Sequence, residues 1–201
     1  MQVTDLMSET SHDKSNGYEE IAEHFMRARN PRIGPSNVRE WCRTLARGSS
    51  VLDLGCGNGV PISQVLIEEG FDVYGVDASA KLIAAFRSRF PHAHAECSAI
   101  EDSDFFGRKF DGVIAWGVMF LLPPDVQSVI IHEAAGVLNR NGKFLFTAPE
   151  QAITWSDSLT GRESISLGAE RYKQLLRVEG FVLVGEESDE GDNHYYLASK
   201  P

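Results

Sequence analysis

The segment Asp53-Leu54-Gly55-Cys56-Gly57-Asn58-Gly59 constrains the fold of this chain more than any other part of its sequence. It follows the apolar run 51–54, which is typical of a short buried strand, and it precedes a helical pattern over residues 60–69. Glycines at such a corner let the backbone turn sharply and approach a ligand closely, because no Cβ intervenes. The next helix start offers free N–H groups to a polar or anionic group. The segment therefore predicts a ligand-binding turn, rather than a tight turn without a ligand.

Strand and helix patterns alternate along the rest of the chain. Apolar runs predict strands at residues 51–54, 71–76, 94–97, 110–116 and 143–148, with helical patterns between most of them. Short links between strands and helices favour a parallel sheet covered on both faces. Residues 181–186 and 195–199 flank a link rich in Gly, Asp and Asn, which is typical of an antiparallel hairpin. We therefore expect an α/β fold with a doubly wound, mostly parallel sheet, an antiparallel C-terminal hairpin and helices on both faces.

Length and local composition predict one domain preceded by a tail. A chain of 201 residues suits a single domain, since domains typically hold ~100–200 residues. Residues 1–16 are polar and predict a loose N-terminal tail. Residues 17–47 predict two helices separated at Pro31, with Ser36 as a cap of the second. Residues 149–166 predict an irregular insert.

Charge and cysteine usage argue against several classes of partner. The chain has 19 Lys and Arg residues against 29 Asp and Glu residues, and the net charge of −10 disfavours nucleic acid. The three cysteines are widely spaced and form no Cys-x-x-Cys pair, which argues against a disulfide framework or a metal site. There is no apolar run of the ~20 residues that span a bilayer, and the N-terminus lacks a signal peptide pattern. We therefore expect a cytoplasmic protein without a membrane partner.

Two features narrow the ligand. The Gly-x-Gly-x-Gly spacing departs from the dinucleotide fingerprint Gly-x-Gly-x-x-Gly, because Val60 stands three residues after Gly57. A pyrophosphate cradle is therefore less favoured. Asp77 ends the second strand, and a carboxylate there can accept two hydrogen bonds from a ribose diol. The alternative is that Asp77 caps the following helix, a role that Ser79 can share.

The ordered set of motifs resembles the class I S-adenosylmethionine-dependent methyltransferases. The segments that carry the resemblance are Val51–Gly59, Gly75–Ser79, Cys97–Glu101, Phe110–Trp116 and Val137–Lys143. The motifs cover about residues 48–150, and the architecture covers residues 17–201. The resemblance implies a seven-stranded sheet with a reversed last strand and S-adenosyl-L-methionine as the cofactor. It also implies a single methyltransferase domain over 17–201, in which 17–47 form a helical lid and the insert 149–166 lies near the methyl acceptor.

The resemblance assigns the cofactor site residue by residue. Asp53 would hold the amino group of the methionine part, Asp77 the ribose hydroxyls and Ala78 one face of the adenine. The remaining assignments are Gly55, Cys56, Gly57 and Gly59 to the methionine part, and Ser98, Ala99 and Ile100 to the adenine edge and its other face. Ser98 departs from the family pattern, because many relatives carry an Asp there as the acceptor for the adenine amino group.

Aromatic and basic residues mark the place where the methyl group would react. The resemblance puts Trp116 near the sulfonium and the substrate, and a sulfonium favours aromatic faces such as those of Trp116, Tyr18 and Phe120. His194 lies beside acidic residues at the start of the last strand and, with Tyr195, is a candidate general base; the alternative is a strand pair that only packs on the sheet. One of Arg27, Arg29 and Arg32 can bind a carboxylate of the cofactor or substrate. The alternative is that they form a solvated helix end. Trp155, Asp157 and Arg162 are candidate specificity residues of the insert, or parts of an ordinary surface loop.

These observations favour transfer of a methyl group from S-adenosylmethionine to a nitrogen or oxygen atom of a small molecule. About 50 N-terminal residues and the 18-residue insert are the only parts left to cover an acceptor, which suits a small enclosed molecule. The fourth strand lacks the Asn/Asp-Pro-Pro-aromatic sequence of enzymes that methylate base amino groups. The alternatives are methylation of a protein and a catalytically silent S-adenosylmethionine-binding protein. A nicotinamide-dependent oxidoreductase is disfavoured by the glycine spacing and the terminal hairpin.

Overall fold

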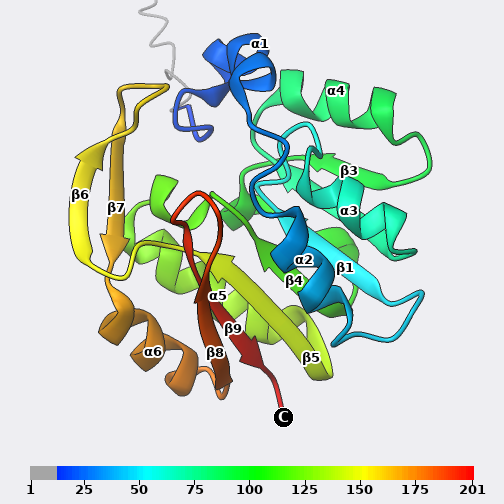
Figure 1. Ribbon diagram of the computed structural model, residues 1–201, viewed down its shortest axis with the longest axis vertical. Coiled ribbons are helices and arrows are strands. Elements are labelled where there is room, and N and C mark those ends of the chain that lie inside the picture. Colours follow the sequence, from blue (N-terminus) through cyan, green and yellow to red (C-terminus); the bar gives the residue numbers. More distant parts are fainter. Residues whose placement is uncertain (1–12) are drawn as a thin grey trace, which may run out of the picture.

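The computed structural model describes residues 13–201 and shows the expected α/β architecture (Figure 1). Its central sheet has seven strands in the order β3-β2-β1-β4-β5-β9-β8. The strands are β1 (Ser50–Leu54), β2 (Asp72–Asp77), β3 (His94–Cys97), β4 (Phe110–Ala115), β5 (Leu138–Thr147), β8 (Val182–Ser188) and β9 (His194–Ser199). β1 to β5 are parallel to one another, whereas β9 runs antiparallel between β5 and β8. The predicted fold class is confirmed.

Helices cover both faces of the sheet because the central strands β1 and β4 are apolar and buried on both sides. Val51 faces one buried cluster together with residues of α2 (Pro35–Cys42), α3 (Ile62–Glu68) and α4 (Ala80–Arg89). Leu52 faces the other cluster, with residues of α5 (Pro124–Val137) and α6 (Ala169–Val178). Three short 3₁₀ helices complete the domain, namely η1 (Ile100–Asp102), η2 (Phe105–Gly107) and η3 (Met119–Leu121). Within residues 13–201, no helix has the length and apolar character needed to cross a membrane.

The strand order places a crevice at the carboxyl ends of β1 and β4. The chain moves from β1 to β2 on one side and returns to pair β4 on the other side of β1. Ligands of open α/β sheets bind at such a switch point. α1 (Tyr18–Ala28) contributes residues to a cavity at this edge, whereas α2 packs its Trp41 side chain into the core against Gly112.

The insert after β5 is regular, which differs from the prediction. β6 (Ala152–Ser156) and β7 (Glu163–Leu167) form a separate two-stranded antiparallel sheet, the β6–β7 hairpin, which stands beside the N-terminal segment in Figure 1. Asp157 closes the turn, since its Oδ1 accepts hydrogen bonds from the backbone N–H groups of Leu159 and Thr160. An aspartate that bonds its own downstream backbone is a turn signal, and it flanks the alternating run of β6.

One prediction at the N-terminal end also needs correction. Ser36 does not cap α2, because the helix starts one residue earlier, at Pro35, after Gly34 in a left-handed conformation. Proline suits the first helical position, since its fixed φ is helical and its missing N–H has no partner there. Most of the predicted tail lies outside the described residues. Residues 13–16, however, form a hydrogen-bonded turn in which Asp13 accepts bonds from the backbone N–H groups of Ser15 and Gly17.

Replacement of Gly59 tests the packing of the glycine segment against α4. Gly59 has a φ of +80°, and a Cβ there would lie 2.5 Å from Phe90 and 2.9 Å from Phe86. We expect Gly59→Ala to lower the free energy of unfolding by roughly 2–4 kcal/mol, as the sum of left-handed strain and core overlap. Gly48→Ala is the matched control, because its φ is +78° and the space around it is open. Urea unfolding measures the free energy of unfolding of both variants. Equal losses of this free energy would contradict the predicted overlap of the new Cβ with Phe86 and Phe90.

Candidate active site

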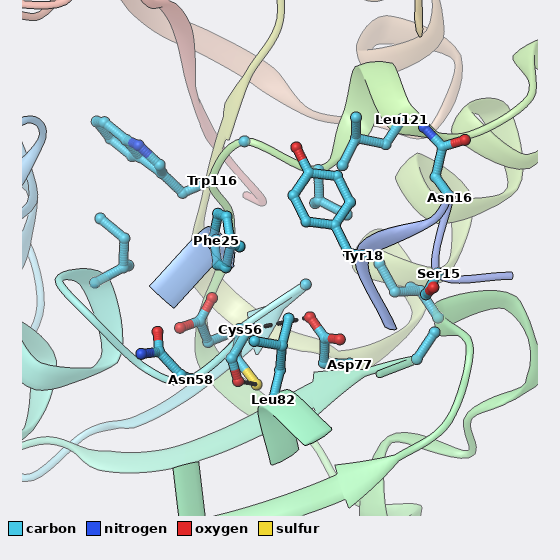
Figure 2. A pocket seen from close by; sticks show the side chains of 18 of the residues that line it. Ser15, Asn16, Tyr18, Phe25, Cys56, Asn58, Asp77, Leu82, Trp116 and Leu121 are labelled. Carbon is cyan, nitrogen blue, oxygen red and sulfur yellow. Dashed lines mark hydrogen bonds between the residues drawn. The ribbon is translucent and has the colours of Figure 1, made fainter. Parts of the chain in front are cut away.

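A cavity opens at the carboxyl ends of β1, β2 and β4, where the glycine segment lies (Figure 2). We call it the first cavity. The predicted site residues that line it are Tyr18, Asp53, Gly55, Cys56, Gly57, Asp77, Ala78, Ile100 and Trp116. These residues come from five separate parts of the chain, so the fold brings together most of the cofactor site expected from the sequence. Gly59, Ser98 and Ala99 do not line the first cavity.

The glycine segment is held against β2 by backbone hydrogen bonds. The N–H groups of Gly55 and Cys56 both donate to the carbonyl of Val76, at 2.8 and 3.1 Å. Gly57 adopts a φ of +55°, and its N–H donates to Oδ2 of Asp77 at 2.9 Å. Because Gly57 has no side chain, its backbone lines the cavity. A Cβ on Gly59 would instead point at the aromatic rings of α4. The lack of a side chain at Gly59 therefore allows this packing, and its expected contact with the cofactor stays a prediction.

Asp77 both fixes the turn and faces the first cavity. Its Oδ1 accepts the N–H of Ser79 at 2.8 Å, in addition to the bond that Oδ2 accepts from Gly57. Burial raises the pKa of Asp77 above its usual value. The cap of α4 is Ser79, whose Oγ accepts the N–H of Leu82. Each carboxylate oxygen of Asp77 keeps lone-pair capacity for a further donor, which suits a ribose diol.

Asp53 is a buried carboxyl group at the floor of the first cavity. Only 1% of its surface is exposed, and Oδ2 accepts a hydrogen bond from Ser63. Burial raises the pKa of Asp53 to about 7, with a further increase from the charge of Asp77 and a decrease from Arg29. In the described part of the chain, no cationic group lies within 4.0 Å of this carboxyl. A buried carboxylate without a cation fits the ammonium of an amino acid moiety.

The adenine side of the first cavity differs from the expectation. Ala78 and Ile100 line it, but Oγ of Ser98 donates to the carbonyl of Ala99, and neither residue reaches the cavity. Glu101 lines this side instead and forms an ion pair with Lys14 at 3.2 Å. Glu101 ends the segment Cys97–Glu101 that carries the family resemblance. Its carboxylate, three residues after Ser98, was the sequence signal that could have identified it as a residue of the cavity wall.

A second cavity of about 630 Å³ adjoins the first one and extends toward the β6–β7 hairpin. Its walls include Trp155 and Asp157 of the hairpin, Phe120 of η3 and His194 of β9. Phe120 and Trp155 pack against each other with ring centroids 5.4 Å apart. The two cavities share four lining residues, namely Tyr18, Arg29, Trp116 and Gly117. We call these four residues the junction.

The three residues predicted for catalysis take different positions. Trp116 belongs to the junction, and His194 lines only the second cavity, where its Nε2 lies 3.3 Å from a carboxylate oxygen of Glu186. Tyr195 lines neither of these cavities, and its buried ring packs against Trp116 with ring centroids 5.3 Å apart. Successive side chains of a strand point to opposite faces, so His194 and Tyr195 cannot both face the site. The predicted catalytic role of Tyr195 is therefore not supported.

The three arginines around Pro31 lie in different surroundings. Arg29 is half-buried at the junction, and burial lowers its pKa. Arg27 forms an exposed ion pair with Glu23, and Arg32 is exposed. Arg29 is therefore the arginine that can meet an anionic group of a ligand. In the hairpin, Arg162 forms an ion pair with Asp13 at 2.9 Å and does not line the second cavity.

Comparison with known proteins finds similarity to methyltransferases. Residues 51–142 match the methyltransferase domain family. Glycine N-methyltransferase of Oryctolagus cuniculus is 35% identical over 109 residues, which cover 46% of this chain and 37% of that protein. The tRNA (carboxymethyluridine(34)-5-O)-methyltransferase alkbh8 of Xenopus tropicalis is 29% identical over 132 residues, which cover 64% of this chain and 19% of that protein. The chain thus spans only about a third of the length of the first relative and about a fifth of the length of the second.

The fold also matches a solved structure with a product nucleoside bound. The 1,6-didemethyltoxoflavin-N1-methyltransferase of Burkholderia thailandensis, solved with its substrate and S-adenosylhomocysteine, superposes with a TM-score of 0.71 and 19% identity. The match covers 92% of this chain and 84% of that one. The doubly wound sheet, its reversed last strand and the cavity lined by Asp53 and Asp77 define a Rossmann-like α/β fold with a cavity at the carboxyl ends of its strands. Within this fold, residues 51–142 match a methyltransferase domain, and the solved methyltransferase shares the overall architecture of the chain.

Replacement of Asp77 tests the ribose contact. We expect Asp77→Ala to weaken binding of S-adenosylhomocysteine at least about tenfold, because hydrogen bonds to a charged group contribute roughly 1.5–3 kcal/mol each. Asp72→Ala is the matched control, since this exposed carboxylate lies at the other end of β2 and does not line the first cavity. Isothermal titration calorimetry on folded variants measures both affinities. An unchanged affinity in Asp77→Ala would remove the proposed role.

The pKa of Asp53 predicts a pH dependence of cofactor binding. An ammonium bound beside Asp53 favours the ionised carboxylate, whereas the free protein holds a proton there below about pH 7. Binding therefore releases a proton at low pH, and affinity for S-adenosylhomocysteine should rise by up to about tenfold per pH unit below pH 7 and level off above it. Calorimetry between pH 5.5 and 8.5, chosen as roughly 1.5 units on either side of that pKa, checks the slope. Asp53→Asn should bind more weakly and lack the slope; a variant with the same slope would exclude Asp53 as its source.

Proposed function

We propose that the protein transfers a methyl group from S-adenosylmethionine to a nitrogen or oxygen atom of a small molecule held in the second cavity. The observation that supports this proposal is the junction, where the first cavity meets the second beside Trp116. A cofactor in the first cavity and an acceptor in the second would approach each other only there. The bound cofactor supplies a methyl group that is already activated on a sulfonium.

The residues of the chain then act by holding and orienting. Asp53 would bind the amino group of the cofactor, Asp77 its ribose, and Ala78 and Ile100 its adenine. Trp116 offers an aromatic face at the junction, which stabilises a nearby cation. Orientation of two reactants can supply roughly 7–11 kcal/mol of a barrier, so the site needs no protein nucleophile.

The size and chemistry of the second cavity favour a small acceptor. Its volume of about 630 Å³ lies within the roughly 300–1,000 Å³ typical of small-molecule sites. α1 and the β6–β7 hairpin supply walls on which aromatic rings of Tyr18 and Trp155 gather. One relative methylates tRNA according to its name, but the net charge of −10 on this chain disfavours a phosphate backbone. The relative named for glycine methylation is consistent with a small acceptor.

Two other functions stay as alternatives. A protein side chain or terminus could enter the second cavity in place of a small molecule. A catalytically silent protein could bind S-adenosylmethionine and act through partners, because methyl transfer requires no signature residue beyond the binding site. Each alternative gives a distinct result in the same labelling experiment.

Labelled methyl transfer tests the proposed function. The protein is incubated with methyl-labelled S-adenosylmethionine and three separate acceptor pools, which are a metabolite extract, a protein extract and total RNA. We expect label in the metabolite pool above that of an Asp77→Ala control, because the loss of Asp77 weakens cofactor binding. Label confined to protein or RNA would contradict the small-molecule acceptor, and cofactor binding without label in any pool would favour the silent protein.

A further inference from the structure

Tyr18 is held in one hydrogen-bonding state by the β6–β7 hairpin. Its hydroxyl lies 3.2 Å from Oδ2 of Asp157. A carboxylate can only accept, so the hydroxyl of Tyr18 donates its single proton to Asp157. The oxygen of Tyr18 is then restricted to accepting hydrogen bonds from any other partner.

The orientation of Asp157 is itself fixed. This residue is 8% exposed, and its Oδ1 accepts bonds from two backbone N–H groups and from the hydroxyl of Thr160. Tyr18 also packs its ring edge-on against Phe25, with centroids 5.2 Å apart. Figure 2 shows the ring of Tyr18 extending into the cavity space near Leu121. The phenol oxygen is therefore positioned by contacts on both sides.

The junction contains one side-chain acceptor. Among its four residues, the guanidinium of Arg29 and the indole N–H of Trp116 only donate hydrogen bonds, and Gly117 has no side chain. Tyr18 is thus the junction side chain that can accept a hydrogen bond from a reacting group. Burial, strengthened by the charge of Asp157, raises the pKa of Tyr18 well above its ordinary value, so the phenol stays neutral and cannot remove a proton as a phenolate.

On this basis we infer that the acceptor atom is an N–H nitrogen of an amine, and that Tyr18 positions it by accepting the hydrogen bond of that N–H. The inference rests on the proposed function and narrows its nitrogen-or-oxygen choice. A neutral amine offers a lone pair for the methyl group and an N–H for Tyr18 at the same time. A hydroxyl acceptor must lose its proton to a base during transfer, and the junction side chains provide none.

The bonds and charges of the transfer balance without a protein base. The nitrogen lone pair forms the new N–C bond, and the electron pair of the C–S bond stays on sulfur, which becomes neutral. The positive charge moves to the methylated nitrogen, which then loses a proton to water. Tyr18 keeps its own proton, donated to Asp157, and only orients the nitrogen. It is therefore a positioning residue in this proposal.

The position of the transferred carbon tests the inference directly. The protein is incubated with S-adenosylmethionine carrying a carbon-13 methyl group and with a metabolite extract, and the product is examined by carbon-13 NMR. We expect the chemical shift and coupling of N–CH₃. A product with O–CH₃ or S–CH₃ would overturn the inference and leave the proposed function in place. Absence of any labelled product would overturn the proposed function and the inference with it.

Tyr18→Phe tests the role of the hydroxyl in that reaction. The variant keeps the ring and loses one hydrogen bond, so we expect KM for the amine to rise about three- to tenfold while the affinity for S-adenosylhomocysteine stays within about twofold. Tyr196→Phe is the matched control, because the buried hydroxyl of Tyr196 has no hydrogen-bond partner among residues 13–201 and lies outside both cavities. Calorimetry with the product amine, in the presence of S-adenosylhomocysteine, measures its binding without turnover. Equal amine KM values in the two variants would overturn the role of Tyr18.

Discussion

The attachment of the glycine segment to β2 is the interaction on which the site depends. Val76 accepts two backbone N–H groups of this segment, and Asp77 accepts a third together with the N–H of Ser79. These bonds join the end of β1, the end of β2 and the start of α4. These bonds fix the backbone around the buried carboxyl of Asp53 and the cavity-facing backbone of Gly57. The cavity is thus a product of strand order and a few directed hydrogen bonds.

Periodicity and glycine spacing were sufficient to predict the sheet and the turn that lines the first cavity. Strand β1 and its glycine turn combine a short apolar run with residues that tolerate positive φ, and such signals are local in sequence. Asp77 could be identified because it ends a strand that must neighbour β1. The β6–β7 hairpin was missed because its strands are short, β6 is largely exposed, and its turn depends on Asp157 bonding its own backbone.

Residues whose role depends on distant partners could not be assigned from the sequence. Arg29 is one of three neighbouring arginines, and only the packing of α1 over the sheet edge distinguishes it. Tyr195 and His194 are adjacent in sequence, but the register of β9 against β5 decides which of them faces the core. Glu101 replaces Ser98 at the cavity wall because η1 turns the chain immediately after β3. Each of these outcomes is a matter of side-chain direction, which composition and spacing do not encode.

The β6–β7 hairpin forms a sheet of its own and shares no ladder of strand hydrogen bonds with the central sheet. Its side chains wall the second cavity, whereas Asp53 and Asp77 belong to strands of the central sheet. If the second cavity holds the acceptor, as proposed, substitutions in the hairpin can alter the shape of that cavity and leave the register of β1 and β2 unchanged. The proposed function then implies that the range of acceptors and the binding of the methyl donor can evolve separately, because a single short hairpin lines the acceptor cavity.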